Sequence, residues 1–510
     1  MNVRTDPLLR KGLDHVTRYA ISSLASRLAL QGLARHTAPT VANATLALSV
    51  LLFATTVSFR DARAGEQVDL RAAQPVGSHH KVTAVLEASG KLRLNADGRG
   101  VQEVPVAIEG RLSYIDRIVA RNEEGGTHRV LPHRVIRRYD EAKGKIHVRK
   151  WEIKTSLGKS RRLIAVAKKH GQPLVYYSPL GPLTTQDLDI LQLQFDPLAV
   201  AEILPSEPVE DGSKWKVAPA TLATLMGMDA VLESKVRATV SAIEDAAVRI
   251  ELAGTMEGTV DGVSSRIELR GKLRWDRTLR RVTWVAVHFH ERRDISHTAP
   301  GFDTEARLRI QISPHRVPID VDDELLKKVA QGPDAPELLV ALASQSGFEL
   351  LHPRTWKQVI DGPDVTVLRL VDKGELIAQA NISRVNEAKD LTLGEFQREV
   401  EQALGKKFQQ WVAADEKQNG DIHLFHLIAA GETEGLSIQW IYYHLRDGAG
   451  RRATVAFTIE SKLMEQFAGA DEQLVSTLKL VDPADAKKDS TTDAAGATRE
   501  AKSAAGPVRQ

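Results

Sequence analysis

The segment from Arg266 to Arg274 reads Arg-Ile-Glu-Leu-Arg-Gly-Lys-Leu-Arg, so an apolar or small residue stands at every second position. Residues 248–252 and 307–312 show the same alternation of aliphatic with charged or polar side chains. A period of two with polar alternates is typical of an antiparallel sheet that has one face in water. The sequence therefore predicts a β-rich antiparallel domain over residues 65–316.

A faint internal repeat runs through this region. Three short segments recur in order, at an offset of 164 residues for the first two and 161 for the third. They are Leu86–Gly90, Asp97-Gly98 and Ile108–Tyr114, matched by Ile250–Gly254, Asp261-Gly262 and Leu269–Trp275. One interpretation is a domain of two similar halves that form a curved sheet or half-barrel; the other is chance similarity between hairpins. The duplicated arrangement distantly resembles the LolA-like carriers of the bacterial envelope, and this resemblance implies an apolar ligand.

A second region covers residues 344–481. It opens with Gly-Phe-Glu-Leu-Leu-His-Pro-Arg-Thr-Trp at 347–356, where a strand is expected to stop at Pro353 and Trp356 to return over a sheet. Thr392 and Glu395 form a capping box for a helix. The region ends with a strand followed by a helix, and it resembles the α/β/α sandwich of PsbP-like proteins. That resemblance implies an accessory or binding role with no shared catalytic residues.

Two segments separate or follow these regions. Residues 317–343 contain prolines and two short helical stretches, Asp322–Ala330 and Glu337–Ser344, and are predicted to be a linker with short helices. Residues 482–510 are rich in Ala, Lys, Asp, Ser and Thr and contain no aromatic residue, so they predict a disordered tail. The whole chain is thus predicted to be an α+β multidomain protein.

The amino-terminal segment has the features of an export signal. A leader that carries several Arg residues precedes the uncharged run from Ala42 to Phe59, which is followed by Ala62-Arg63-Ala64. Small residues two positions apart after an apolar segment indicate a signal peptide over residues 1–64, cleaved before Gly65. The protein would then be periplasmic or extracellular. The alternative is a permanent membrane anchor through residues 42–59, a run near the lower limit of spanning length.

Composition narrows the function classes. Residues 1–64 hold eight Lys/Arg and three Asp/Glu, so removing their net +5 from the chain's +3 leaves −2. This balance gives no support for a nucleic-acid partner. The chain contains no cysteine, which excludes disulfides, thiolate metal sites and a cysteine nucleophile.

Few residues indicate chemistry. His288 and His290 share one face of a predicted strand and are candidate metal ligands, although a third ligand is required. Glu291 would point to the other face; the alternative is that both imidazoles lie in water. His79 and His80 are interpreted as a solvated turn.

Two functions from different classes remain. The leading hypothesis is an exported envelope protein with a non-enzymatic binding role, whose partner is an apolar ligand or another envelope protein. It would need no cofactor, and it would contact the membrane only through an uncleaved leader. The alternative is an exported hydrolase or metal-dependent enzyme with a site assembled from scattered His, Asp and Ser, although no nucleophile elbow, zinc motif or phosphate loop is present. A cavity lined by aliphatic side chains would favour the first hypothesis, and one with convergent His and carboxylates the second.

Overall fold

The computed structural model describes residues 66–482, apart from 73, 97–99, 125–128, 150, 170, 297–299 and 386–389. Strands make up 57% of it and helices 17%, which confirms the predicted β-rich antiparallel character. The predicted signal peptide and its alternative as an anchor lie outside the described residues, as does the predicted tail after Asp482. Among the helices that are described, none has the length and apolar character needed to cross a membrane.

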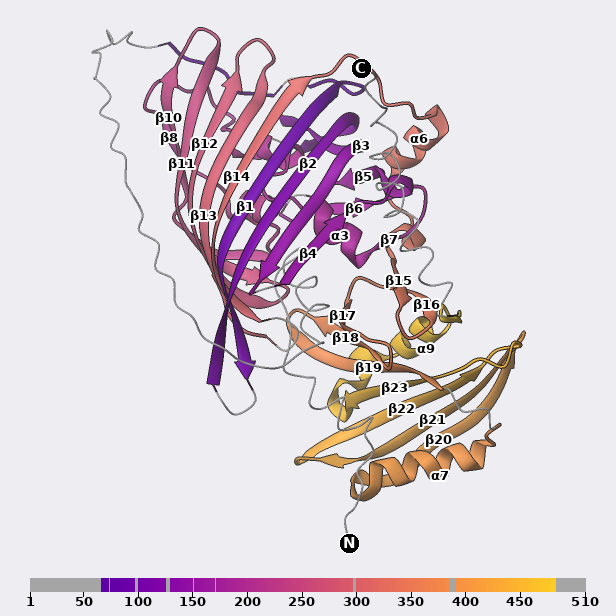
Figure 1. Ribbon diagram of the computed structural model, residues 1–510. Helices are drawn as coiled ribbons and strands as arrows, with labels where there is room; N and C mark the ends of the chain where they lie inside the picture. The colour runs from indigo at the N-terminus through magenta and orange to yellow at the C-terminus, as the bar shows by residue number, and fades with distance from the viewer. Residues whose placement is uncertain are drawn as a thin grey trace, which may run out of the picture.

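A curved antiparallel sheet dominates the structure (Figure 1). In the described part of the chain it has thirteen strands, and its main path runs β6-β5-β3-β2-β1-β14-β13-β12-β11-β10-β8 with β4 beside β3 and β9 beside β11. The strands β1 and β14 pair in the middle, so the first and last strands of the region hold its two wings together. The bounds are β1 His79–Ala96, β2 Gly100–Glu124, β3 Arg129–Val148, β4 Trp151–Ser156, β5 Leu163–Ala167, β6 Val175–Tyr177, β8 Lys214–Lys216, β9 Ala230–Ser234, β10 Arg237–Ile243, β11 Ala247–Val260, β12 Val263–Asp276, β13 Arg281–Arg293 and β14 Gly301–Pro314.

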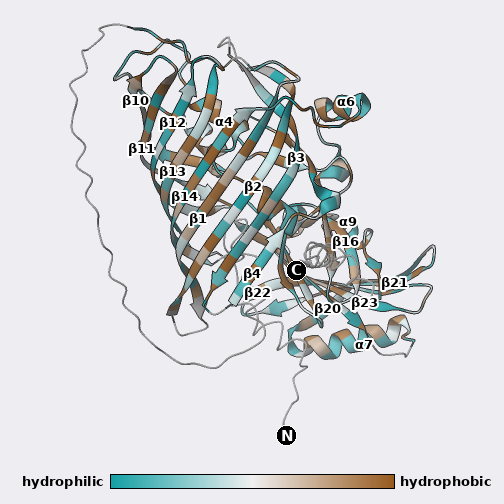
Figure 2. Ribbon diagram, turned by 45° about the horizontal axis from the view of Figure 1, so that its top comes forward, coloured by the Kyte–Doolittle hydropathy of each residue, from teal (hydrophilic) through white to brown (hydrophobic). Residues whose placement is uncertain are grey.

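Residue alternation determines which face of this sheet is buried. In β12, Ile267, Leu269 and Leu273 are buried, and the intervening charged residues are exposed. Figure 2 shows the resulting stripes of apolar and polar residues across the strands. The apolar side chains line the concave side, as period-two patterning dictates.

The repeated segments belong to two hairpins, β1–β2 and β11–β12, although Asp97-Gly98 lies outside the described residues. Their registers differ, however. Leu86 pairs with Gly110 in the first hairpin, whereas Ile250 pairs with Leu273 in the second. The counterpart of Gly110 in the repeat is Gly271, which pairs instead with Leu252. The hairpins are therefore offset by two residues, a shift that keeps every side chain on its face. Duplication of the domain stays a prediction.

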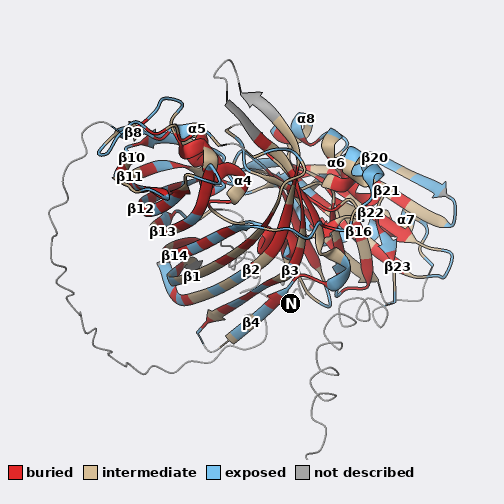
Figure 3. Ribbon diagram, turned by 90° about the horizontal axis from the view of Figure 1, so that it is seen from above, coloured by how far each residue is buried: buried red, intermediate tan, exposed pale blue. Residues whose placement is uncertain are grey.

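Short helices occupy the concave side of the sheet, as the view from above shows (Figure 3). They follow one another between β7 and β9, and their apolar residues join the largest hydrophobic core. Their bounds are α3 Thr185–Leu191, α4 Pro197–Val200, η2 Ala201–Ile203 and α5 Pro219–Met226, with β7 at Leu183–Thr184 and η1 earlier at Lys159–Arg161. The convex side is covered at one place by α6, Asp323–Gln331, which packs through Val329 near Ile136.

The carboxy-terminal part contains a second antiparallel sheet, with strand order β17-β18-β19-β23-β22-β21-β20. Its face bearing Phe425 and Trp440 is covered by α7, whose capping box of Thr392 and Glu395 confirms the predicted helix start. The other face is covered by α8 and α9. The bounds are β17 Trp356–Asp361, β18 Thr366–Asp372, β19 Glu375–Val385, α7 Leu393–Leu404, η4 Gly405–Lys407, β20 Phe408–Asn419, β21 Ile422–Thr433, β22 Leu436–Arg446, β23 Arg452–Glu460, η5 Ser461–Leu463, α8 Met464–Phe467 and α9 Ala470–Val475.

A small sheet connects the two parts. Its order is β24-β16-β15-β7, with β15 at Val340–Ser344, β16 at Phe348–His352 and β24 at Lys479–Leu480. The helix predicted over Glu337–Ser344 is wrong for most of its length: η3 covers only Ala335–Leu338 and β15 follows. Pairing with β7 on one side and β16 on the other draws Val340 and Leu342 into an extended, buried conformation. The predicted linker therefore ends inside a sheet, and the division into domains stays a prediction.

A buried imidazole gives this part of the protein a pH dependence. His444 on β22 lies against the rings of Phe396 and Phe425, with ring centroids 5.3 and 6.0 Å away. Burial, with a smaller contribution from the charge of Arg452, lowers the pKa of His444 to about 4. An unfolded histidine has a pKa of about 6.5, so between these values the unfolded chain binds the extra proton.

We expect the stability from this site to be complete above pH 6.5 and to fall as the pH drops toward 4. In the His444→Phe variant, the free energy of unfolding should depend less steeply on pH between pH 7 and pH 4.5. Urea titrations at a series of pH values would measure this slope. The control is His147→Gln, which changes an exposed ring on β3. An unchanged slope in His444→Phe would contradict the assignment.

Candidate functional site

An apolar cavity lies on the concave side of the large sheet. The empty space between its walls is about 840 Å³, but this figure includes the part that is open to solvent, so the enclosed part is much smaller. Inward-facing residues of β1, β2, β13 and β14 form most of its floor, and the segment after α3 covers one side. Two exposed cationic residues, Arg111 on β2 and Lys143 on β3, also belong to its lining. The lining residues are Ala84, Leu86, Ala88, Val106, Ile108, Gly110, Arg111, Leu112, Lys143, Ile190, Gln192, Leu193, Gln194, Phe289, Glu291, Phe302, Thr304 and Ala306.

Small side chains at inward positions create this space. Ala88 on β1 pairs with Ala306 on β14, and Leu86 pairs with Gly110 on β2. Large aliphatic residues at these positions would fill the concave side, and the small residues leave it open. The cavity was not predicted from the sequence. The available signal was the alternation of small and large residues at inward positions, such as Ala84, Leu86 and Ala88.

A buried ion pair fixes the segment that covers the cavity. Arg137 projects from β3 into the concave side and donates two hydrogen bonds, of 2.7 and 2.6 Å, to the two carboxylate oxygens of Asp196. Asp196 also accepts from the Tyr176 hydroxyl at 3.0 Å and from the Leu198 amide at 2.9 Å, where it caps α4. The residue before it, Phe195, is fully buried and has a φ of 52°. The covering residues 192–194 are thus held between α3 and this anchor.

The anchor stays charged in its apolar surroundings. Burial lowers the pKa of Arg137, but Asp196 more than offsets this effect, so the pKa lies well above its usual value. The guanidinium carbon also stands 4.7 Å from the centre of the Tyr114 ring, a favourable cation–π geometry. The position of the covering segment therefore depends on a desolvated ion pair.

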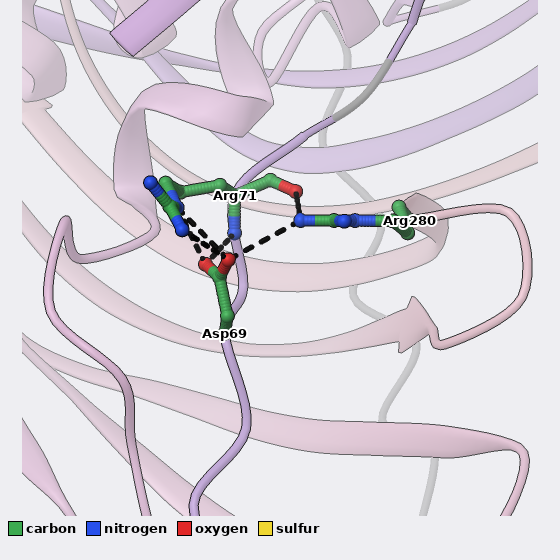
Figure 4. A network of polar contacts seen from close by, with 3 residues as sticks. All are labelled: Asp69, Arg71 and Arg280. Atoms are coloured by element: carbon green, nitrogen blue, oxygen red, sulfur yellow. Dashed lines mark hydrogen bonds and ion pairs between the residues drawn. The ribbon is translucent and has the colours of Figure 1, made fainter. Parts of the chain in front are cut away.

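The start of the described chain closes one end of the large sheet. Figure 4 shows Asp69 between Arg71 and Arg280, the latter at the β12–β13 turn. Nε of Arg71 donates to the two Asp69 oxygens at 3.0 and 2.8 Å, and an Arg280 nitrogen lies 3.2 Å from Asp69 Oδ2. This bonding from Arg71 lowers the pKa of Asp69. The contacts hold Val68 and Leu70 in the main core.

Two neighbouring polar residues interrupt the apolar lining. Glu291 on β13 pairs with Thr304 on β14, and both are buried and line the cavity. Glu291 accepts hydrogen bonds from Ser265 Oγ at 2.6 Å and from Arg293 Nε at 3.0 Å, both at Oε1. The placement of Glu291 on the face opposite to His288 and His290 is as predicted.

The two candidate metal ligands lie on the convex, partly exposed face of β13. His290 Nε2 is 2.5 Å from Asp303 Oδ1, and His288 Nε2 is 3.7 Å from Glu305 Oε2. Within the described ranges, no group of three His, Cys, Asp or Glu is arranged to hold a metal ion. His297, which lies close to this pair in the sequence and could supply a third imidazole, is outside those ranges. Metal binding by this pair stays a prediction.

The interpretation of His79 and His80 as a solvated turn is wrong. Both belong to β1, and His80 is buried, with its Nδ1 3.2 Å from Asp116 Oδ1 on β2. Register explains the difference. His80 pairs with Asp116, and both residues face the concave side.

Comparisons with known proteins identify no family. No protein-family model matches the chain, and no curated protein matches it either. Among solved structures, the cyanobacterial PsbP protein of Synechocystis is 17% identical, with a TM-score of 0.22 over 28% of this chain and 92% of its own.

Two other solved structures are similarly distant. A Pseudomonas aeruginosa protein of unknown function, described as a putative regulator, is 13% identical over 26% of this chain and 92% of its own, with a TM-score of 0.20. A Bacteroides thetaiotaomicron protein is 14% identical over 27% of this chain, with a TM-score of 0.21, and the chain spans 47% of its length. These are weak fold resemblances, and they carry no argument about function. The resemblance to LolA-like carriers stays a prediction.

Proposed function

We propose that this chain is an exported, non-enzymatic binding protein that holds an apolar molecule on the concave side of its large sheet. The observation that carries the proposal is the cavity itself, whose floor is made mainly of aliphatic and aromatic side chains. Concave, mostly apolar pockets with a few placed polar groups are typical ligand sites. The lining residues in the described part include no His, Asp or Ser, which favours binding over the alternative of a hydrolase.

The rest of the chain is consistent with an accessory role. We propose that residues 344–481 form a PsbP-like module, supported by helices on both faces of its sheet. The leader over residues 1–64 supports a location in the periplasm or outside the cell. Binding of another envelope protein as a second partner is compatible with this proposal.

The test is to fill the cavity and measure binding. Protein purified from its own envelope fraction would first be examined by native mass spectrometry for a retained apolar molecule. After delipidation, binding of the fluorescent apolar probe N-phenyl-1-naphthylamine would be compared between the wild type and Ala88→Phe. Ala88 lies half-buried on the cavity floor, so the added ring should take the space of the ligand and weaken probe binding by about tenfold or more.

The matched control is Ala107→Phe. Ala107 is also half-buried but lies on the convex face of β2, one pair away from Ala88 in the β1–β2 register. Its variant should bind the probe as the wild type does. Equal binding by Ala88→Phe and Ala107→Phe, or no binding by the wild type, would refute a ligand site in this cavity.

A further inference from the structure

Glu291 and Thr304 place two hydrogen-bonding groups side by side on the cavity floor. They are cross-strand partners on β13 and β14, and each is less than 10% exposed. Phe289 and Phe302, which also line the cavity, surround them with apolar surface. A ligand that extends along this floor must therefore bring either an apolar or a polar group to this position.

Only one oxygen of Glu291 is used by the protein. Ser265 and Arg293 both donate to Oε1, and in the described residues no hydrogen bond reaches Oε2. The Thr304 hydroxyl likewise makes no hydrogen bond within the described part of the chain. Neither atom is among the fully buried side-chain atoms that lack a partner, so both lie at the accessible surface of the cavity. A ligand that covers this surface would take both atoms out of water, so each favours a ligand that can hydrogen-bond to it.

The charge at this position is already balanced. Arg293 neutralises Glu291, and its guanidinium carbon stands 4.6 Å from the centre of the Phe302 ring. The carboxylate oxygen still requires a donor and repels a second carboxylate, while the threonine hydroxyl can donate or accept. An uncharged hydroxyl satisfies both groups, because it donates one hydrogen bond and accepts another.

We propose that Glu291 and Thr304 select an amphiphile with an uncharged hydroxyl head, such as a long-chain alcohol, over a free fatty acid. This inference rests on the proposed function, since it places the head of the ligand in the same cavity. A site built to hydrogen-bond a hydroxyl discriminates against analogues without one, because its own polar groups are then left without partners. The aliphatic floor takes the chain, and the Glu291–Thr304 pair takes the head.

The experiment measures displacement of N-phenyl-1-naphthylamine from the delipidated full-length protein. The displacing compounds are 1-dodecanol, dodecyl methyl ether and dodecanoate at pH 7.5, each below its aggregation concentration. The ether has the same chain but no donor, so we expect 1-dodecanol to displace the probe at roughly one tenth of the ether's concentration. Equal displacement by alcohol and ether would overturn the proposal.

Two variants assign the effect to the residues. Glu291→Gln should strengthen displacement by dodecanoate by about tenfold, since the repelling charge is gone and Arg293 is left to attract the ligand. Thr304→Val keeps the side-chain shape and should weaken displacement by 1-dodecanol by about threefold to tenfold without affecting the ether. Thr83→Val, on the convex face of β1, is the control and should change nothing.

The outcomes separate the two proposals. If the probe does not bind, or if Ala88→Phe binds it as well as the wild type, the apolar site itself is wrong. If the probe binds in the cavity but the variants leave the order of the three compounds unchanged, the site stands and the selection by Glu291 and Thr304 is refuted. Thr304→Val decides the question should Glu291→Gln fail to fold.

Discussion

Replacing Asp196 by alanine should destabilise the protein by about 3–5 kcal/mol. The side chains of Arg137 and Asp196 are each only 1% exposed. Removing the carboxylate leaves a charged guanidinium in apolar surroundings, and this loss is much larger than that of a surface ion pair. The variant also loses the cap of α4. Urea unfolding followed by far-UV circular dichroism would measure the change.

Two comparisons make this prediction specific. Asp140→Ala removes the exposed partner of Lys81 and should cost about 0–1 kcal/mol. The double variant Arg137→Met, Asp196→Leu removes both charges and should recover most of the stability lost in Asp196→Ala, because an apolar pair of similar volume avoids the desolvation cost. A loss below about 0.5 kcal/mol in Asp196→Ala, or no recovery in the double variant, would show that the pair does not anchor the segment.

The double variant also tests the role of the anchor in binding. It keeps the core filled but removes the hydrogen bonds that fix residues 192–194 beside the cavity. If the double variant is stable, its affinity for N-phenyl-1-naphthylamine shows whether the cavity binds an apolar molecule only when residues 192–194 are held in place.

Local patterning was enough to predict the strands but not the cavity. In β12, the face on which each side chain lies can be predicted from the neighbouring residues in the sequence, because a period of two places Ile267 and Arg266 on opposite faces. The cavity depends instead on Ala88 meeting Ala306 across β1 and β14, strands that lie far apart in the sequence. This register depends on how the whole sheet closes, so the alternation of Ala84, Leu86 and Ala88 does not by itself show that a second alanine lies opposite.

The buried ion pair and the small sheet were not predicted from the sequence, for related reasons. Arg137 stands in a run with Arg134 and Arg138 that is typical of a solvated strand, and only its partner Asp196 explains its burial. Val340–Ser344 has no strong preference between helix and strand, and pairing with β7 and β16 decided it. The candidate site therefore lies where tertiary contacts override local preference.

Trp356→Ala should destabilise the protein by about 3–5 kcal/mol, as large-to-small changes in a core do. The strand β16 ends at His352, and the Trp356 amide donates to the Pro353 carbonyl at 3.1 Å, which turns the chain into β17. The indole is 2% exposed, as the sequence predicted, and lies edge-to-face with Phe457 at 6.0 Å between ring centroids. The measurement is the shift of the urea midpoint, followed by circular dichroism.

Trp284→Ala is the matched control, because Trp284 is 37% exposed on the convex face of β13. Its loss should change stability by less than about 0.5 kcal/mol, the range of surface substitutions. Trp356→Phe should lie between the two, since a smaller ring keeps part of the contact with Phe457. Should Trp356→Ala unfold at the same urea concentration as Trp284→Ala, the indole would not be part of the core, and the packing of β17 against Phe457 would have to be wrong.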